Sequence, residues 1–288
     1  MDPERRIARR RRAILWIFGL LVGFCVLVVL LTIPGFVLSM RENARRERCD
    51  INLALIYQGF VEYCDANGTF PPAFTTDSNG AKLHSWRVLL LPYIGEEELY
   101  SQIRLDEPWD SEWNRQFWTK TPNVYRCAST PVSEGDPSAS ERLCAYSAVL
   151  GPNSALPEDG RAVSPKEIVD GGAGAILLVE RKTPVNWTDP NSEITMDSAL
   201  QENEKPVRER ENFGSWHGRG ETVLFCDGSR RFLSEKIDNS VLKLLFGIDD
   251  SASAGALESA ESEEESEDGA LPDQVVPAVG ESGAESGD

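Results

Sequence analysis

AILWIFGLLVGFCVLVVLLTIPGFVLSMRENARRERCDINLALIYQGFVEYCDA, residues 13–66, determines the architecture of this chain. Its first part, residues 13–38, has no charged side chain. Its second part, residues 39–66, mixes charges with apolar residues at helical spacing. We therefore expect one long helix, of which the first part lies in an apolar medium and the second part packs on a folded body.

The uncharged run has the length of a membrane span. A bilayer core about 30 Å thick needs roughly 20 apolar residues in a helix. A signal peptide is the competing interpretation, but its apolar region is usually about 7–15 residues long and ends at a small-residue cleavage site. This run is longer and no Ala-x-Ala follows it. We predict an uncleaved transmembrane helix over residues 13–38.

The flanking charges predict the orientation of that helix. Residues 1–12 contain six arginines against Asp2 and Glu4, whereas the arginines that follow the run are offset by Glu42 and Glu47. Positive flanks remain in the cytoplasm. We expect residues 1–12 to form a basic cytoplasmic arm, and the rest of this single-pass protein of the inner membrane to be extracytoplasmic.

Two glycines within the span suggest a partner besides the lipid bilayer. Gly19 and Gly23 have the four-residue spacing that lets two membrane helices approach closely. Glycine is also common in membrane helices for other reasons. Helix self-association through Gly19 and Gly23 is therefore one of two open interpretations.

The remainder of the chain to residue 250 predicts one extracytoplasmic α+β domain. Residues 39–66 should form a helix with an apolar stripe, ending near Asn67-Gly68. Asp-Gly at 227–228 between two strand-like runs predicts a hairpin with a two-residue turn. We expect a brief helix at 96–103, strands at 123–127, 143–150 and 174–180, a loop over 188–212 and a last helix at 240–246. The expected stripe comprises Ile51, Leu55, Ile56, Phe60 and Tyr63.

The charge of the chain is concentrated in its tail. Residues 251–288 contain eleven acidic residues and no basic one, so only −7 of the net charge of −18 falls on residues 1–250. A tail of this composition buries too little apolar surface to fold and should be disordered. The folded part has no strongly basic face, which argues against a nucleic-acid partner.

The cysteines suggest one disulfide and no metal site. Cys49 and Cys64 lie fifteen residues apart on one expected helix, which is too far for a bond. Cys127 and Cys144 bracket a polar loop and are the expected pair, although each could equally be a small buried residue. The spacings match no zinc pattern and the chain has only two histidines. We predict no metal and no cofactor.

Eight local strings, in order, carry a family resemblance. They cover about residues 40–235 and end with His217 followed, after nine residues, by Asp227 and Gly228. The other seven are Arg45-Arg46-x-x-Cys49-x-x-Asn52-Leu53, Asn67-Gly68-Thr69-Phe70-Pro71-Pro72, Ser85-Trp86-Arg87-Val88-Leu89-Leu90-Leu91-Pro92-Tyr93, Glu107-Pro108-Trp109-Asp110-Ser111, Val124-Tyr125-Arg126-Cys127, Leu178-Val179-Glu180 and Asn186-Trp187-Thr188.

With these strings the chain resembles the prepilin-like bacterial surface proteins with an H-x9-DG signature (domain of unknown function 1559). The resemblance implies a pseudopilin-like plan, in which a long N-terminal helix is half membrane-embedded and half packed on a small antiparallel sheet. Such proteins usually carry a Gly-Phe-Thr-Leu-x-Glu cleavage motif before the span. Residues 11–16, RRAILW, lack it, which implies a permanently anchored variant.

The candidate site residues each have a structural alternative. His217, Asp227 and Gly228 form the family motif, and we interpret them as braces of the hairpin, because no nucleophile or second histidine lies near them in the sequence. A tryptophan-rich segment could instead present a ligand surface for carbohydrate or peptide, although tryptophan more often fills a core. The tryptophans concerned are Trp86, Trp109, Trp113 and Trp118.

Three functions remain open from the sequence. The first is a non-catalytic, membrane-anchored envelope protein with a structural or assembly role, in contact with secretion-system or other envelope proteins. The second is an extracytoplasmic binding module that uses the tryptophans. The third, an enzyme that uses His217, would need a nucleophile or another titratable group within hydrogen-bond reach of that ring. We expect no enzyme.

Overall fold

The computed structural model describes residues 3–130, 143–206, 209–217, 220–234 and 236–248. Within the first 38 residues, side chains are described only for 15–24, 27–28, 30 and 37. The expected disordered tail, residues 251–288, lies outside the described residues.

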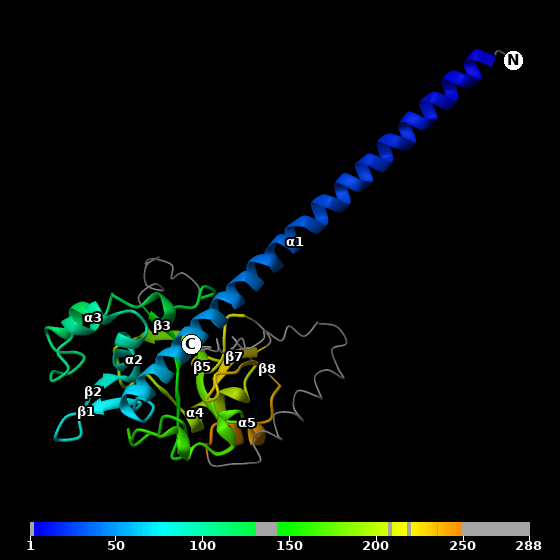
Figure 1. The fold of residues 1–288 in the computed structure, drawn as a ribbon. Coiled ribbons are helices and arrows are strands. Elements are labelled where there is room, and N and C mark those ends of the chain that lie inside the picture. Colours follow the sequence, from blue (N-terminus) through cyan, green and yellow to red (C-terminus); the bar gives the residue numbers. More distant parts are fainter. Residues whose placement is uncertain (1–2, 131–142, 207–208, 218–219, 235, 249–288) are drawn as a thin grey trace, which may run out of the picture.

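A single helix, α1 (Pro3–Asn67), forms the axis of the molecule. Its first half projects from the body and its second half runs across it (Figure 1). It ends where the sequence predicts: Gly68 takes a φ of +80° and donates its N–H to the carbonyl of Cys64 at 2.7 Å. Among the residues that the structure describes, no helix has the length and the hydropathy of a membrane span.

The buried face of α1 differs in phase from the expected stripe. Cys49, Leu53, Ile56 and Phe60 are fully buried, with helical spacings of four, three and four residues. Ile56 and Phe60 were predicted correctly. The prediction was wrong for Ile51 and Leu55, which are 51% and 48% exposed, because each lies about 200° around the helix from Leu53 or Cys49.

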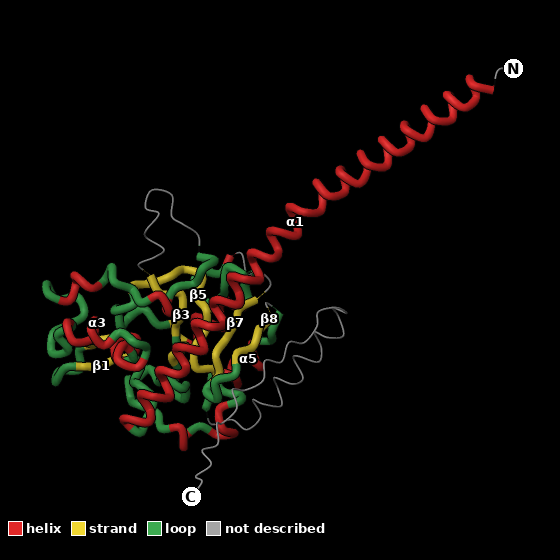
Figure 2. Tube along the Cα trace, turned by 45° about the horizontal axis from the view of Figure 1, so that its top comes forward, coloured by secondary structure: helices red, strands yellow, loops and turns green. Residues whose placement is uncertain are grey.

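Behind this face of α1 lies a four-stranded antiparallel sheet of order β3-β5-β7-β8, so the α+β class is confirmed (Figure 2). The strands are β3 (Leu143–Ser147), β5 (Ile176–Asn186), β7 (Gly220–Phe225) and β8 (Arg230–Ser234). Polar contacts fasten the helix to the last hairpin. Arg230 Nε donates to Asp50 Oδ1 at 2.8 Å, and the Tyr57 hydroxyl donates to the carbonyl of Cys226 at 3.2 Å.

Two small strand pairs and several short helices complete the body. β1 (Phe74–Thr76) pairs with β2 (Lys82–Ser85), and β4 (Val149–Leu150) with β6 (Ile194–Thr195). The α-helices are α2 (Trp86–Leu89), α3 (Glu97–Gln102), α4 (Met196–Asn203) and α5 (Asn239–Leu245). The 3₁₀-helices are η1 (Leu91–Tyr93), η2 (Asn114–Phe117), η3 (Asn123–Tyr125), η5 (Pro165–Glu167) and η6 (Val169–Gly172).

Two of the local predictions were wrong. The strand expected at 123–127 is η3, which starts after Pro122 with its fixed φ. The loop expected over 188–212 contains α4, whose first turn is capped by the Thr195 side chain, which accepts from the N–H of Ser198. α4 packs with α5 beside the sheet and buries Ala199. The short helices expected at 96–103 and 240–246 are confirmed.

The hairpin at Asp227-Gly228 has a different turn from the predicted one. Gly228 N–H donates to the carbonyl of Phe225 at 3.0 Å, which puts Cys226 and Asp227 at the centre of the turn. Gly228 follows with a φ of +85°. The connection therefore has three residues, ending in a left-handed glycine. The Asp227 carboxylate accepts from the Ser229 N–H at 2.8 Å, which fixes the turn locally.

Gly228 also supports the packing of α1. A Cβ at this position would lie 2.3 Å from Cε1 of Tyr57 on the helix. Gly228→Ala should therefore combine the cost of a left-handed residue, about 1 kcal/mol, with overpacking of about 1–3 kcal/mol. Gly80→Ala is the matched control, because Gly80 has a φ of +84° and nothing within 4 Å. In urea unfolding of the full-length protein, Gly228→Ala should have a much lower free energy of unfolding than Gly80→Ala. Equal decreases in this free energy would contradict the contact with Tyr57.

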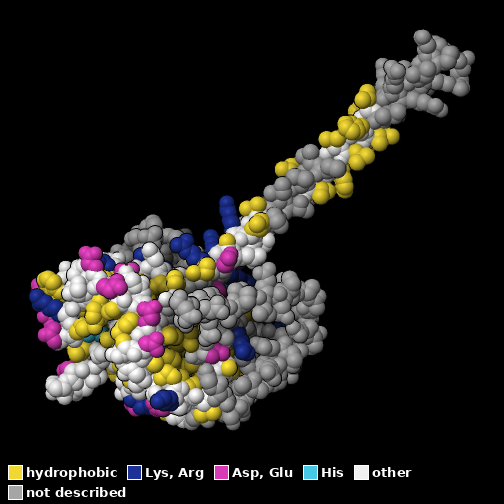
Figure 3. Space-filling view, in the orientation of Figure 1, with side chains coloured by type: hydrophobic (Ala, Val, Ile, Leu, Met, Phe, Trp, Pro, Cys, Tyr) yellow, Lys and Arg dark blue, Asp and Glu magenta, His cyan; other side chains and the backbone are white. Residues whose placement is uncertain are grey.

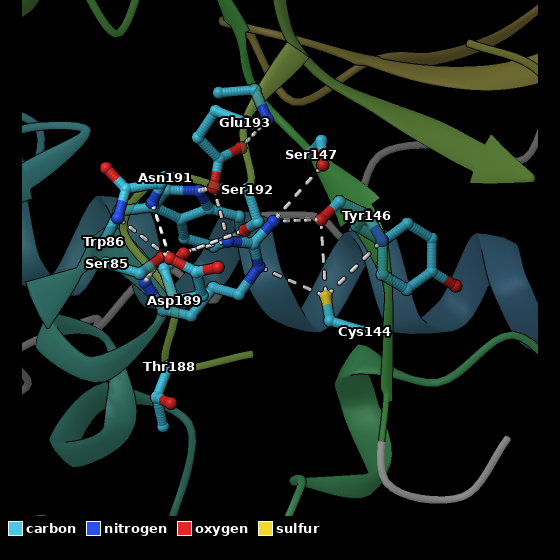
Figure 4. A network of polar contacts seen from close by, with 12 residues as sticks. Ser85, Trp86, Cys144, Tyr146, Ser147, Thr188, Asp189, Asn191, Ser192 and Glu193 are labelled. Carbon is cyan, nitrogen blue, oxygen red and sulfur yellow. Dashed lines mark hydrogen bonds and ion pairs between the residues drawn. The ribbon is translucent and has the colours of Figure 1, made fainter. Parts of the chain in front are cut away.

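A buried polar network joins several segments within the core (Figure 4). Arg87 and Glu193 form an ion pair with side chains 0% and 1% exposed. Glu193 also accepts from Trp86 Nε1 at 3.1 Å and from the N–H of Ala148 at 2.7 Å. Arg87 donates to the carbonyl of Tyr146 at 2.5 Å. The network thus links α2, β3 and the start of β6 through charged hydrogen bonds.

Removing one charge from this network should cost far more than removing a surface charge. Glu193→Gln leaves the buried guanidinium without a counter-charge, and we expect it to lower the free energy of unfolding by about 3–5 kcal/mol. Glu107→Gln is the control, because Glu107 pairs with Arg104 at 2.8 Å in a position where the two side chains are 33% and 51% exposed, and there the expected cost is below about 1 kcal/mol. Chemical denaturation at neutral pH measures both, and similar losses would refute the role of burial.

Candidate functional site

Four side chains from four distant segments meet where α1 passes the inner strand β5. They are Cys49 of α1, Cys127 just after η3, Glu180 of β5 and His217 just before β7, and one ligand-type atom from each lies within 4.8 Å of the others. We call these four residues the thiol–imidazole cluster.

The distances within the cluster are short. His217 Nε2 lies 3.4 Å from Cys49 Sγ, 3.5 Å from Cys127 Sγ and 3.5 Å from Glu180 Oε1. The two sulfurs are 3.0 Å apart. All four groups therefore converge on one small volume around the imidazole nitrogen.

The other side of the His217 ring is held by α1 and a neighbouring loop. Nδ1 lies 2.7 Å from Glu42 Oε1 and 3.3 Å from the Ser129 hydroxyl. The His217 carbonyl accepts from the Arg46 side chain. Glu42, Arg46 and Cys49 occupy successive turns of α1, so the helix contributes both to the cluster and to the setting of its histidine.

Three members of the cluster are buried, whereas Cys127 is partly exposed. Cys49 is fully buried, and Glu180 and His217 are 1% and 4% exposed. Glu180 Oε2 accepts a hydrogen bond from the N–H of Thr222 at 3.2 Å. Oε1 accepts no hydrogen bond. It lies 3.5 Å from His217 Nε2, close enough for an ion pair but not for a hydrogen bond. A buried oxygen without a donor is unusual and is a sign of a missing cation or proton donor.

Proton positions in the cluster are strongly coupled. A hydrogen bond from Cys127 lowers the pKa of Cys49 to about 4 against the opposing effect of burial, and the same bond with burial raises the pKa of Cys127. Burial alone would lower the pKa of His217, but Cys49, Glu180 and Glu42 raise it to about 10. Burial raises the pKa of Glu180. Without a further cation, the cluster thus pairs a Cys49 thiolate with an imidazolium.

The loop that delivers His217 is fixed by hydrogen bonds of its own. The Ser215 hydroxyl accepts from the N–H of His217 at 3.1 Å and donates to the carbonyl of Gly220 at 2.9 Å. Upstream, the Glu202 carboxylate at the end of α4 accepts from the N–H groups of Glu211, Asn212 and Phe213 at 3.1, 2.7 and 2.8 Å. Glu202 therefore anchors the backbone that leads into the site.

These bonds make Glu202 a source of pH-dependent stability. Burial opposes its ionisation, but the three backbone N–H groups and Asn212 outweigh burial and lower its pKa from the ordinary 4.5. A depressed pKa stabilises the fold above about pH 4.5, and this contribution disappears as the pH falls through the folded-state pKa.

Glu202→Gln should lower the free energy of unfolding by about 2 kcal/mol at pH 7. The difference in this free energy between the variant and the wild type should disappear in acid. Urea unfolding between pH 7 and 3 measures it, and a gap independent of pH would contradict the assignment.

The structure separates the parts of the H-x9-DG motif. His217 precedes β7, whereas Asp227 and Gly228 follow it, so six strand residues lie between the two ends, roughly 20 Å apart. Asp227 and Gly228 stabilise the turn, as the sequence predicts. His217 does not brace that turn, because its ring belongs to the thiol–imidazole cluster.

The cysteine prediction was wrong. Cys127 lies beside Cys49, not Cys144, and both Cys127 and Cys144 have free thiols. Cys144 is buried in the core, where its sulfur lies 3.2 Å from Arg87 Nε. The expectation of no metal site was based on spacing rules that apply to ligands close in sequence, and these rules do not address a cluster assembled from distant segments.

The four tryptophans do not form one surface. Trp86 is fully buried in the core, so its assignment to a ligand surface was wrong. Trp109 and Trp118 stack on each other with centroids 5.1 Å apart. Trp113 is 42% exposed and is covered by the Arg104 guanidinium at 4.2 Å. A cavity of about 330 Å³ between α3 and η3 is lined by none of them.

The fold and the cluster define a class of protein with a long helix built into an α+β body. The family described as "Protein of unknown function (DUF1559)" matches residues 38–183 and 160–240, and the chain belongs to this family. The membership predicted from the eight strings is thereby confirmed. No curated protein and no solved structure matches the chain significantly.

The family strings in the sequence already contain the four cluster residues. Four of the eight strings each contain one of its members: the strings with Arg45-Arg46, Val124-Tyr125, Leu178-Val179 and Asp227-Gly228 contain Cys49, Cys127, Glu180 and His217. Their separation along the chain hid their proximity.

Proposed function

We propose that the protein is a non-catalytic, permanently anchored component of the cell envelope with a pseudopilin-like plan and a structural or assembly role. The first half of α1 spans the inner membrane, residues 1–12 lie in the cytoplasm, and residues 39–250 form an extracytoplasmic head.

The observation that carries this proposal is the exposure of apolar side chains on the projecting half of α1 (Figure 3). Eleven of them between residues 15 and 30 are 41–75% exposed. They are Leu15, Trp16, Ile17, Phe18, Leu20, Leu21, Val22, Phe24, Leu27, Val28 and Leu30. A helix that is apolar on all sides needs an apolar environment. A bilayer provides one, and the arginine-rich flanks favour the proposed orientation.

The second half of α1 supports the pseudopilin-like plan. It packs one face on a small antiparallel sheet while the first half stands free (Figure 1). Residues 11–16 lack the glycine and the glutamate of a prepilin cleavage motif, which favours an anchor that is never processed.

The burial of Cys49 and His217 favours a non-catalytic role. The enzyme hypothesis required a nucleophile near His217, and Cys49 meets that condition at 3.4 Å. However, Cys49 is fully buried and the 330 Å³ cavity is lined by other residues. A thiolate that a substrate cannot reach supports structure better than catalysis.

Charges placed in the span should release the protein from the membrane. Leu20→Arg with Leu27→Arg adds about 5–7 kcal/mol to insertion, at about 2.5–3.5 kcal/mol for each charge. The wild type should remain in the membrane pellet after alkaline carbonate extraction, and protease added to spheroplasts should digest the head. Leu55→Arg, on an exposed position of α1 beside the head, is the matched control and should remain in the pellet.

A freely soluble wild type, or a head protected in intact spheroplasts, would refute the anchor and its orientation. The assembly role has a separate readout, the native mass of the protein extracted in mild detergent. We expect a defined complex larger than one chain, and a monomer in several such detergents would contradict assembly while leaving the anchor intact.

A further inference from the structure

We propose that the thiol–imidazole cluster binds one zinc ion, which fastens α1 to the sheet of the head. The site is independent of where the protein resides, because it is built only from Cys49, Cys127, Glu180 and His217.

The donor set fits zinc. Two thiolates, one imidazole and one carboxylate are ligands that Zn²⁺ accepts, and four protein ligands are typical of a closed structural site. Calcium and magnesium prefer oxygen atoms alone, so the two sulfurs exclude them as preferred occupants. Since all four positions are filled by protein, no open position remains for a substrate.

The spacing of the donor atoms fits a tetrahedral ion. Bonds of about 2.3 Å to sulfur and about 2.0 Å to nitrogen or oxygen place sulfur and nitrogen about 3.6 Å apart, and nitrogen and oxygen about 3.3 Å apart. The sulfurs lie 3.4 and 3.5 Å from His217 Nε2, and Glu180 Oε1 lies 3.5 Å from it. The two sulfurs, at 3.0 Å, must separate by about 0.8 Å.

Glu180 gives independent support. Its Oε1 is buried on β5, points into the cluster and accepts no hydrogen bond. His217 Nε2 lies 3.5 Å from that oxygen and makes no hydrogen bond to it, whereas a cation at the centre of the cluster would bind it directly. A disulfide between Cys49 and Cys127 would leave Glu180 in the same unsatisfied position.

The surroundings of His217 have the arrangement of a metal-binding histidine. Its Nδ1 faces the Glu42 carboxylate at 2.7 Å. When the ring is neutral, the proton on Nδ1 is held by Glu42 and the lone pair of Nε2 points to the cluster. Carboxylate–histidine–zinc triads use this contact to orient the ring and raise its basicity. Glu42 would therefore be a positioning residue for the site.

The ion would close long loops of chain. Cys49, Cys127, Glu180 and His217 come from segments separated by at least 37 positions in the sequence, so one ion would link four segments of the head. Cross-links across long loops remove more unfolded-chain entropy than short ones. Metal binding would then be coupled to folding.

The test is metal analysis of the full-length protein purified without chelator, from whichever cell fraction contains it. We expect about one zinc per chain. Replacement by Co²⁺ should produce the sulfur-to-metal charge-transfer absorption of thiolate ligands, which Cys49→Ser and Cys127→Ser should each abolish or halve. Cys64→Ser is the matched control, because Cys64 lies on α1 outside the cluster, and it should keep the metal content and the spectrum.

A variant of a residue outside the ligand set distinguishes loss of metal binding from loss of the fold. Glu42→Gln retains all four ligands and should weaken zinc affinity by about 10–100-fold, measured by competition with a chromophoric chelator. The proposal is overturned if the isolated protein contains a Cys49–Cys127 disulfide by intact mass after alkylation. It is equally overturned if protein equilibrated with zinc under reducing conditions binds none, or if the double variant of Cys49 and Cys127 retains the metal.

Discussion

The structure depends on the burial of one face of α1 against the head. Cys49, Leu53, Ile56 and Phe60 are fully buried along about three helical turns, and each of the three larger side chains contributes roughly 1.5–3 kcal/mol when removed from water. The sheet, the hairpin and the cluster are all arranged around this face. Tyr57 lies against Gly228, Asp50 pairs with Arg230, and Cys49 enters the cluster. A small head with strands of two to eleven residues thus gains its core by enclosing half of a helix.

The head contains several buried ion pairs. Arg87 with Glu193, Arg210 with Glu221 and His217 with Glu180 are pairs whose side chains are at most 2% exposed. Buried pairs add little net stability compared with apolar packing, but removing one partner is costly. Two of the pairs, Arg87 with Glu193 and His217 with Glu180, join segments that are distant in sequence. We interpret them as determinants of which segments meet, a role that short strands with limited hydrophobic area cannot fill alone.

The sequence predicted elements where local signals were strong. The helix end at Asn67-Gly68, the hairpin around Asp227 and the buried strand containing Glu180 depend on turn chemistry or an apolar run, and all three are present. The phase of the α1 stripe was partly wrong, because Ile51 and Leu55 are as apolar as the residues that are buried. α4 was missed because its polar residues resemble a loop.

The candidate site was beyond local reasoning. Its members lie on four elements, and the rules for metal ligands recognise residues that are close in sequence. A disulfide between Cys127 and Cys144 was predicted because the two bracket a loop, whereas tertiary packing places Cys127 beside Cys49. His217 was assigned to the turn by its distance from Asp227 in the sequence, but a strand carries the two apart. Only the sheet order and the path of α1 bring these residues together.

The continuity of α1 has a geometric consequence for the whole molecule. Because one uninterrupted helix runs from Pro3 to Asn67, each residue before Cys49 has a fixed azimuth, about 100° per position, relative to the face that enters the head. Any lateral contact made by the projecting half therefore sets the direction in which the head faces. Rotating the projecting half about its own axis would turn the sheet through the same angle, since the contacts around Cys49 leave the helix no freedom to swivel within the head.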